Sequence, residues 1–133
     1  MLISMSKSDM LKGNPVTPGW YKATVKNFIT KPPKTGGDSI NYVPTFKLHT
    51  ENEEELDHTF NSKAIGRMAP FIAALEGKNL KQVLDEMETN TLTWDSDSAQ
   101  GAKLQIHVVN ETYEGRLVNK IDQFLPYDAA TPF

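Results

Sequence analysis

The sequence predicts a mainly β domain with one helical region near its middle. Apolar and polar residues alternate in several separate stretches, which is the pattern of half-buried strands. Clusters of proline and glycine separate some of these stretches, as turns require. One central stretch instead has apolar residues at helical spacing. A chain of 133 residues has room for one such domain. We expect the domain to span residues 15–126, between a flexible segment of residues 1–14 and a short tail of residues 127–133.

The first two strands are expected to form a long hairpin. Trp20 to Thr30 alternates between an apolar face that begins with Tyr21 and a lysine-bearing face that begins with Lys22. Residues 31–38 contain two prolines and two glycines, which excludes regular structure and predicts a flexible loop. Ile40 to His49 resumes the alternation and is the second strand.

A short third strand is expected from Leu56 to Phe60, followed by a helix from Lys63 to about Leu75. Ser62 is expected to be the N-cap of this helix. Pro70 lies inside the pattern and should kink or divide the helix. A shorter amphipathic segment follows from Leu80 to Met87. The apolar stripe of the longer helix comprises Ile65, Met68, Phe71, Ile72 and Leu75.

The last two strands are expected at Lys103 to Glu111 and Arg116 to Leu125, with a turn at residues 112–115. Five strands with a helix between the third and the fourth is the order of the OB-fold, whose open face and loops bind oligonucleotides or oligosaccharides. We therefore expect a five-stranded OB-fold-like barrel with a helical segment between strands 3 and 4.

Composition excludes several classes of protein. The absence of cysteine excludes disulfide scaffolds, thiol nucleophiles and cysteine-based zinc sites. The longest apolar run, Ala69 to Leu75, is too short to span a bilayer, and the N-terminus lacks the apolar region of a signal peptide. We expect a soluble protein in the cytoplasm of the cell that contains it.

No catalytic or cofactor-binding signature is present. The sequence lacks a phosphate-binding Gly-Lys-Ser/Thr loop and a Gly-x-Ser-x-Gly motif, and His49, His58 and His107 are not spaced like zinc ligands. Glu51 to His58 is acidic enough to suggest a cation site, but adjacent carboxylates on a loop have no fixed geometry. We expect a solvated turn there, no cofactor, and no enzymatic activity.

Charge is distributed in blocks along the chain. The formal net charge is −3, yet residues 20–49 carry five lysines against one aspartate. Residues 50–58 then carry five carboxylates and no base. A folded chain can therefore gather its basic segments on one face despite an acidic total.

Several turns and strand edges resemble those of a known family. The resemblance covers about residues 15–127, and it implies an OB-fold that binds single-stranded DNA. The family comprises small phage proteins of replication and recombination modules. The segments that carry the resemblance are Pro18–Val25, Lys34–Gly37, Phe60–Lys63, Ala73–Gly77 and Val108–Ile121.

Sequence-tolerant binding of single strands requires cations that follow the phosphates and rings on which bases stack. We expect Trp20, Lys22, Lys26 and Phe28 to share one face of the first strand, and Tyr113 to be an exposed ring. Burial in the core is the alternative for Trp20, Phe28 and Tyr42. The candidate contacts are Trp20, Lys22, Lys26, Phe28, Lys31, Lys34, Tyr42, Lys47, Lys63, Arg67, Lys103, His107, Tyr113, Arg116 and Lys120.

The end of the chain carries a second resemblance. Many single-stranded DNA-binding proteins of bacteria and phages end in an acidic tail with a terminal phenylalanine, which docks replication and repair partners. Pro132 and Phe133 fit that ending, whereas Asp128 is the only acidic side chain nearby. A frayed terminus is the alternative for the tail. An OB-fold interaction or structural module without DNA binding is the alternative for the whole protein.

Overall fold

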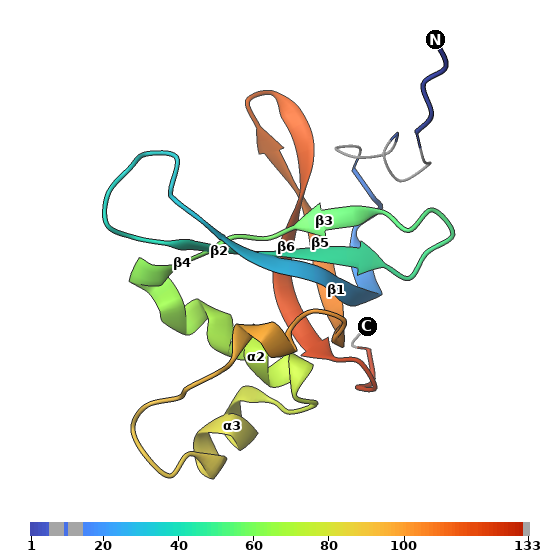
Figure 1. The fold of residues 1–133 in the computed structure, drawn as a ribbon. Helices are drawn as coiled ribbons and strands as arrows, with labels where there is room; N and C mark the ends of the chain where they lie inside the picture. The colour runs from blue at the N-terminus through green and yellow to red at the C-terminus, as the bar shows by residue number, and fades with distance from the viewer. Residues whose placement is uncertain (6–9, 11–14, 132–133) are drawn as a thin grey trace.

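The computed structural model describes residues 1–5, 10 and 15–131. Its main element is an antiparallel sheet in the order β3-β2-β1-β5-β6, with β4 also paired to β2 (Figure 1). The strands are β1 (Gly19–Lys31), β2 (Asn41–Leu48), β3 (Glu55–Asp57), β4 (Phe60–Asn61), β5 (Lys103–Tyr113) and β6 (Arg116–Pro126). The mainly β class, with helical elements between the third predicted strand and the fourth, is confirmed.

The expected closed barrel is wrong. In the described part of the chain, β6 pairs with β5 alone, and β3 and β4 pair with β2 alone, so the sheet is open. Side chains occupy the place where hydrogen bonds between β6 and β3 or β4 would close the sheet. The Phe124 ring centroid is 6.0 Å from that of Phe60 and 5.7 Å from that of His58. The two edges therefore meet through rings rather than through backbone hydrogen bonds.

The third predicted strand is divided into β3 and β4 because Pro44 lies opposite the gap. The register continues across the gap, since Thr45 pairs with Asp57 and Tyr42 pairs with Phe60. The His58 N–H donates to the Pro44 carbonyl at 3.1 Å, but proline has no N–H to donate in return.

A bulge in β1 overturns one expected placement. The register with β2 shifts between Val25 and Asn27, so that Lys26 is the extra residue. Strand alternation is reversed beyond the bulge, and Phe28 faces inward, where its ring contacts those of Phe71 and Trp94. The prediction that Phe28 shares the outer face with Lys22 is therefore wrong.

The helical region is divided as Pro70 predicted. It consists of the 3-10 helix η1 (Ser62–Met68) and the helix α2 (Ala69–Leu75), with Pro70 in the first turn of α2. Asn61, not Ser62, caps η1 by accepting from the Lys63 N–H. Two further helices, α3 (Leu80–Glu86) and the 3-10 helix η2 (Ser96–Ser98), precede β5.

Ile65 leaves the predicted apolar stripe and is 48% exposed, because Ala64 has non-helical backbone angles. Met68, Phe71 and Ile72 are buried as expected, and α2 lies against one side of the sheet (Figure 1). Phe71 is the centre of the core. Its ring lies 5.4–6.1 Å from those of Phe28, Phe46, Phe60, Trp94 and Phe124.

Both ends of the domain are tied to the last hairpin. The Val16 N–H donates to Asn119 Oδ1 at 2.7 Å, and Asn119 Nδ2 donates to the Val16 carbonyl at 3.1 Å. Beyond β6, the Gln105 amide donates to the carbonyls of Pro126, Tyr127 and Ala129. Among the described residues, no helix is both long enough and apolar enough to cross a membrane.

Candidate nucleic-acid interface

Two lysines on the outer face of β1 and β2, Lys26 and Lys47, are neutralised by neighbouring carboxylates. Lys26 Nζ lies 3.0 Å from both carboxylate oxygens of Glu55 in β3. Lys47 Nζ lies 3.4 Å from Glu53. The acidic stretch that the sequence predicted to be a solvated turn thus places Glu55 in a strand, beside the lysines that we expected to contact phosphates.

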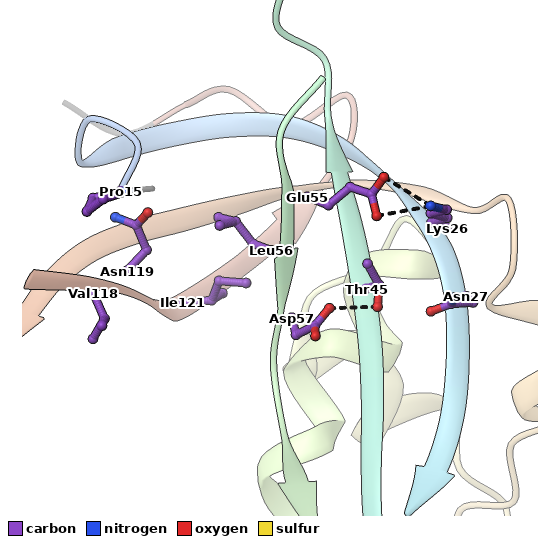
Figure 2. Close-up of a pocket in the computed structure, with 10 residues that line it drawn as sticks. All are labelled: Pro15, Lys26, Asn27, Thr45, Glu55, Leu56, Asp57, Val118, Asn119 and Ile121. Carbon is purple, nitrogen blue, oxygen red and sulfur yellow. Dashed lines mark hydrogen bonds and ion pairs between the residues drawn. The ribbon is translucent and has the colours of Figure 1, made fainter. Parts of the chain in front are cut away.

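A hollow of about 460 Å³ adjoins this face, and Figure 2 shows the residues that line it. Lys26 and Glu55 form one side of it, and Thr45 donates to Asp57 at 2.7 Å beside them. Pro15 and Asn119 line the opposite side. Because two carboxylates face one lysine, the hollow is unfavourable for an anionic phosphate.

Lys22 and Lys103 lie under the tail. Their Nζ atoms are 4.7 Å and 5.6 Å from the centroid of the Tyr127 ring, at cation–π distance. The His49 ring packs on the same tyrosine at 5.7 Å. Gln105, which is 2% exposed, holds the tail in this position.

The predicted stacking rings lie in different environments. Trp20 is half-buried against His107, whose Nδ1 lies 2.6 Å from a carboxylate oxygen of Asp122. Tyr42 stacks on Phe28 and packs against the core. Tyr113 is 59% exposed, which confirms its expected exposure.

Tyr113 belongs to a hairpin that extends beyond the rest of the sheet (Figure 1). Glu114 and Gly115 form the two-residue turn, with φ angles of 50° and 78°. This left-handed geometry is the one that tight antiparallel hairpins require, and it places Arg116 directly opposite Tyr113.

Five candidate cations remain without an ion pair or a ring contact in the part of the chain that the structure describes. They lie on the β1–β2 loop and its entry, on η1 and on the β5–β6 hairpin, rather than on the sheet face. The base of the loop is joined to the start of η1, because Ser62 N–H donates to the Ile40 carbonyl and Ile40 N–H donates to Ser62 Oγ, each at 2.9 Å. The five are Lys31, Lys34, Lys63, Arg67 and Arg116.

A groove lies in the open seam of the sheet, and we call it the seam groove. It has a volume of about 810 Å³ and runs between residues 58–61 with η1 on one side and residues 120–124 of β6 on the other. Burial lowers the pKa of His58, and the nearby positive charge of Lys120 lowers this pKa further. His58 is therefore neutral at pH 7.

The structure brings Arg67 and Lys120 to this groove, together with the rings of His58, Phe60 and Phe124. The sequence does not indicate these three rings as contacts, because their meeting depends on the open seam. The remaining predicted cations are not gathered in one place. Among the described residues, no cluster of side chains is suited to hold a metal ion. Pro132 and Phe133 lie outside the described residues.

The sequence matches no family model and is significantly similar to no curated protein.

Proposed function

We propose that this protein binds single-stranded DNA without sequence preference, using an OB-type fold. The strand order β3-β2-β1-β5-β6, with helices before β5, is that of a partly open OB-fold in which the final strand pairing is missing. In such folds the loops between strands 1 and 2 and between strands 4 and 5 contact oligonucleotides. The corresponding segments of this chain are residues 32–40 and the β5–β6 hairpin.

One observation carries the proposal: among the described residues, three of the five unpaired cations lie at those segments, and the other two lie in η1, whose first residue is hydrogen-bonded to the base of the first loop. Lys31 directly precedes the first loop, Lys34 lies in it, and Arg116 lies at the hairpin turn beside the exposed ring of Tyr113. An unpaired cation can neutralise a phosphate and release its counterion, whereas a lysine held by a carboxylate gains less from doing so. Binding is therefore assigned to the loops and η1, not to the face of β1 and β2.

The proposal includes no catalysis. The sequence resemblance extends it to a role in phage DNA replication or recombination, with Pro132 and Phe133 as a docking point for phage or host replication and recombination proteins.

Titration of labelled oligo(dT) with the full chain, followed by fluorescence anisotropy, tests the proposal. We expect saturable binding at low salt, a steep loss of affinity as salt rises, and weaker binding to a duplex of the same length. An oligo(dT) that stays free at low salt would show that the protein does not bind single strands.

A protein-interaction module is the second candidate, and the ion pairs of Lys26 and Lys47 favour it. They leave Lys26 and Lys47 on the outer face of β1–β3 without excess positive charge, which suits a protein partner better than a row of phosphates. If this candidate is correct, the anisotropy titration gives no binding at any salt concentration.

A further inference from the structure

Three aromatic side chains line the seam groove, and they differ in burial. Phe60 is 4% exposed and belongs to the core. Phe124 and His58 are only half-buried, and both line the groove. The planes of the His58 and Phe124 rings are inclined at 77° to each other, with centroids 5.7 Å apart. The groove therefore has an aromatic floor that a further flat ring can contact.

Positive charge lies on both sides of this floor. Arg67 comes from η1 and Lys120 from β6, and both line the groove. The nearest carboxylate of Lys120, that of Glu111, is at 4.0 Å, the outer limit of an ion pair. Asp122 also lines the groove, but its carboxylate is held by His107. Arg67 and Lys120 are therefore able to bind an anion.

The size of the groove matches a small ligand. Its volume of about 810 Å³ falls within the range of about 300–1,000 Å³ typical of small-molecule sites. Rings below and cations at the sides are complementary to one unstacked base with its phosphate.

We propose that the seam groove binds a single nucleotide of the bound strand, with its base against Phe124 and His58 and its phosphate between Arg67 and Lys120. This inference rests on the proposed function, and it specifies where one base of the strand is held. Stacking on rings accepts every base, so the subsite adds affinity without adding sequence preference.

Photo-crosslinking of the unaltered chain tests the subsite directly. An oligo(dT) in which 5-iododeoxyuridine replaces thymidine is irradiated with the protein, and the modified peptides are mapped. We expect cross-links at Phe124 or His58. Binding accompanied by cross-links only at other rings, such as Trp20 or Tyr113, would overturn the subsite and leave the proposed function intact. Absence of any binding would overturn the proposed function itself.

Two Phe→Leu variants separate base stacking from general packing. Phe124→Leu keeps an apolar side chain but removes the ring from the groove, whereas Phe28→Leu removes a half-buried core ring that does not line it. We expect Phe124→Leu to bind oligo(dT) about tenfold more weakly and Phe28→Leu to bind normally. On an abasic oligonucleotide of equal length, both variants should match the unaltered protein.

The subsite is wrong if Phe124→Leu binds oligo(dT) as well as Phe28→Leu does. Thermal melting shows whether each variant is folded. Should Phe124→Leu not fold, Arg67→Gln replaces it, because Arg67 is exposed and outside the core. Its loss should weaken binding about fivefold at roughly 0.1 M salt and remove the cross-links at Phe124. An affinity and a cross-link pattern unchanged by Arg67→Gln would also overturn the subsite.

Discussion

Two pairs of lysines distinguish the interface inferred from the structure from the one expected from the sequence. Lys31 and Lys34 are unpaired and lie at the β1–β2 loop, whereas Lys26 and Lys47 are held by carboxylates on the sheet face. The double variants Lys31→Gln/Lys34→Gln and Lys26→Gln/Lys47→Gln each remove two positive charges from β1, β2 or their loop. A general effect of net charge therefore acts on both, and the difference between them reports direct contact with phosphates.

The magnitude follows from counterion release. Each phosphate contact of a single strand contributes a slope of about −0.7 to the plot of log K against log salt. The five unpaired cations predict a total slope of at most about −3.5. Loss of Lys31 and Lys34 should reduce this slope by about 1.4, which corresponds to roughly 25-fold weaker binding at about 0.1 M salt. Loss of Lys26 and Lys47 should change affinity less than about twofold.

Anisotropy of labelled oligo(dT), measured at several salt concentrations, gives both quantities for each variant. Melting curves verify that the variants are folded. If Lys26→Gln/Lys47→Gln costs as much affinity as the loop variant, the ion-paired lysines exchange their carboxylates for phosphates. The assignment of binding to the loops would then be refuted.

Two further predictions concern stability. Burial lowers the pKa of His58 below its ordinary value of 6.5. As pH falls from above 6.5 towards the folded-state pKa, the unfolded state therefore binds more protons than the folded state, and the free energy of unfolding decreases. In urea unfolding, the decrease in stability between about pH 7.5 and pH 5 should be smaller for His58→Gln than for the unaltered protein, and equal decreases would contradict the burial effect. Gln105→Ala removes the amide that donates to the carbonyls of Pro126, Tyr127 and Ala129, and of these three only Pro126 keeps another donor in the described part of the tail, the Ala129 N–H. We expect a loss of about 1–3 kcal/mol and faster hydrogen exchange in residues 127–131, whereas unchanged exchange would show that Gln105 does not hold the tail.

Alternation of apolar and polar residues was sufficient to predict β1, β2, β5 and β6, because an alternating stretch runs through each of these strands. It did not predict the inward turn of Phe28. A bulge is defined by how two strands pair, and Lys26 carries no local signal that it is the extra residue. Pro44 indicates a missing hydrogen bond in the sheet, since proline has no N–H to donate. Which residues of the third strand lie opposite Pro44 is known only from the pairing of the two strands.

The candidate site was less predictable than the fold, because whether a lysine is free depends on its neighbour. The sequence identified Arg67 and Lys120 as cations, but it did not indicate that η1 and β6 would place them beside the ring of Phe124. That meeting joins residues more than fifty positions apart across an unpaired seam. Only the three-dimensional arrangement shows it.

The blocks of charge along the chain have a different consequence from the one first expected. In an antiparallel meander each strand pairs with the next strand in the sequence, so a basic hairpin followed by an acidic stretch places opposite charges side by side. The five carboxylates of residues 50–58 follow β2 directly, and Glu55 and Glu53 lie within ion-pair distance of Lys26 and Lys47. Alternating blocks in such a fold therefore predict neutralisation on the sheet face rather than a basic surface. A cation is not neutralised in this way where the chain extends beyond the neighbouring strands. Lys34 in a loop and Arg116 at a hairpin turn are therefore the better candidates for contact with a phosphate.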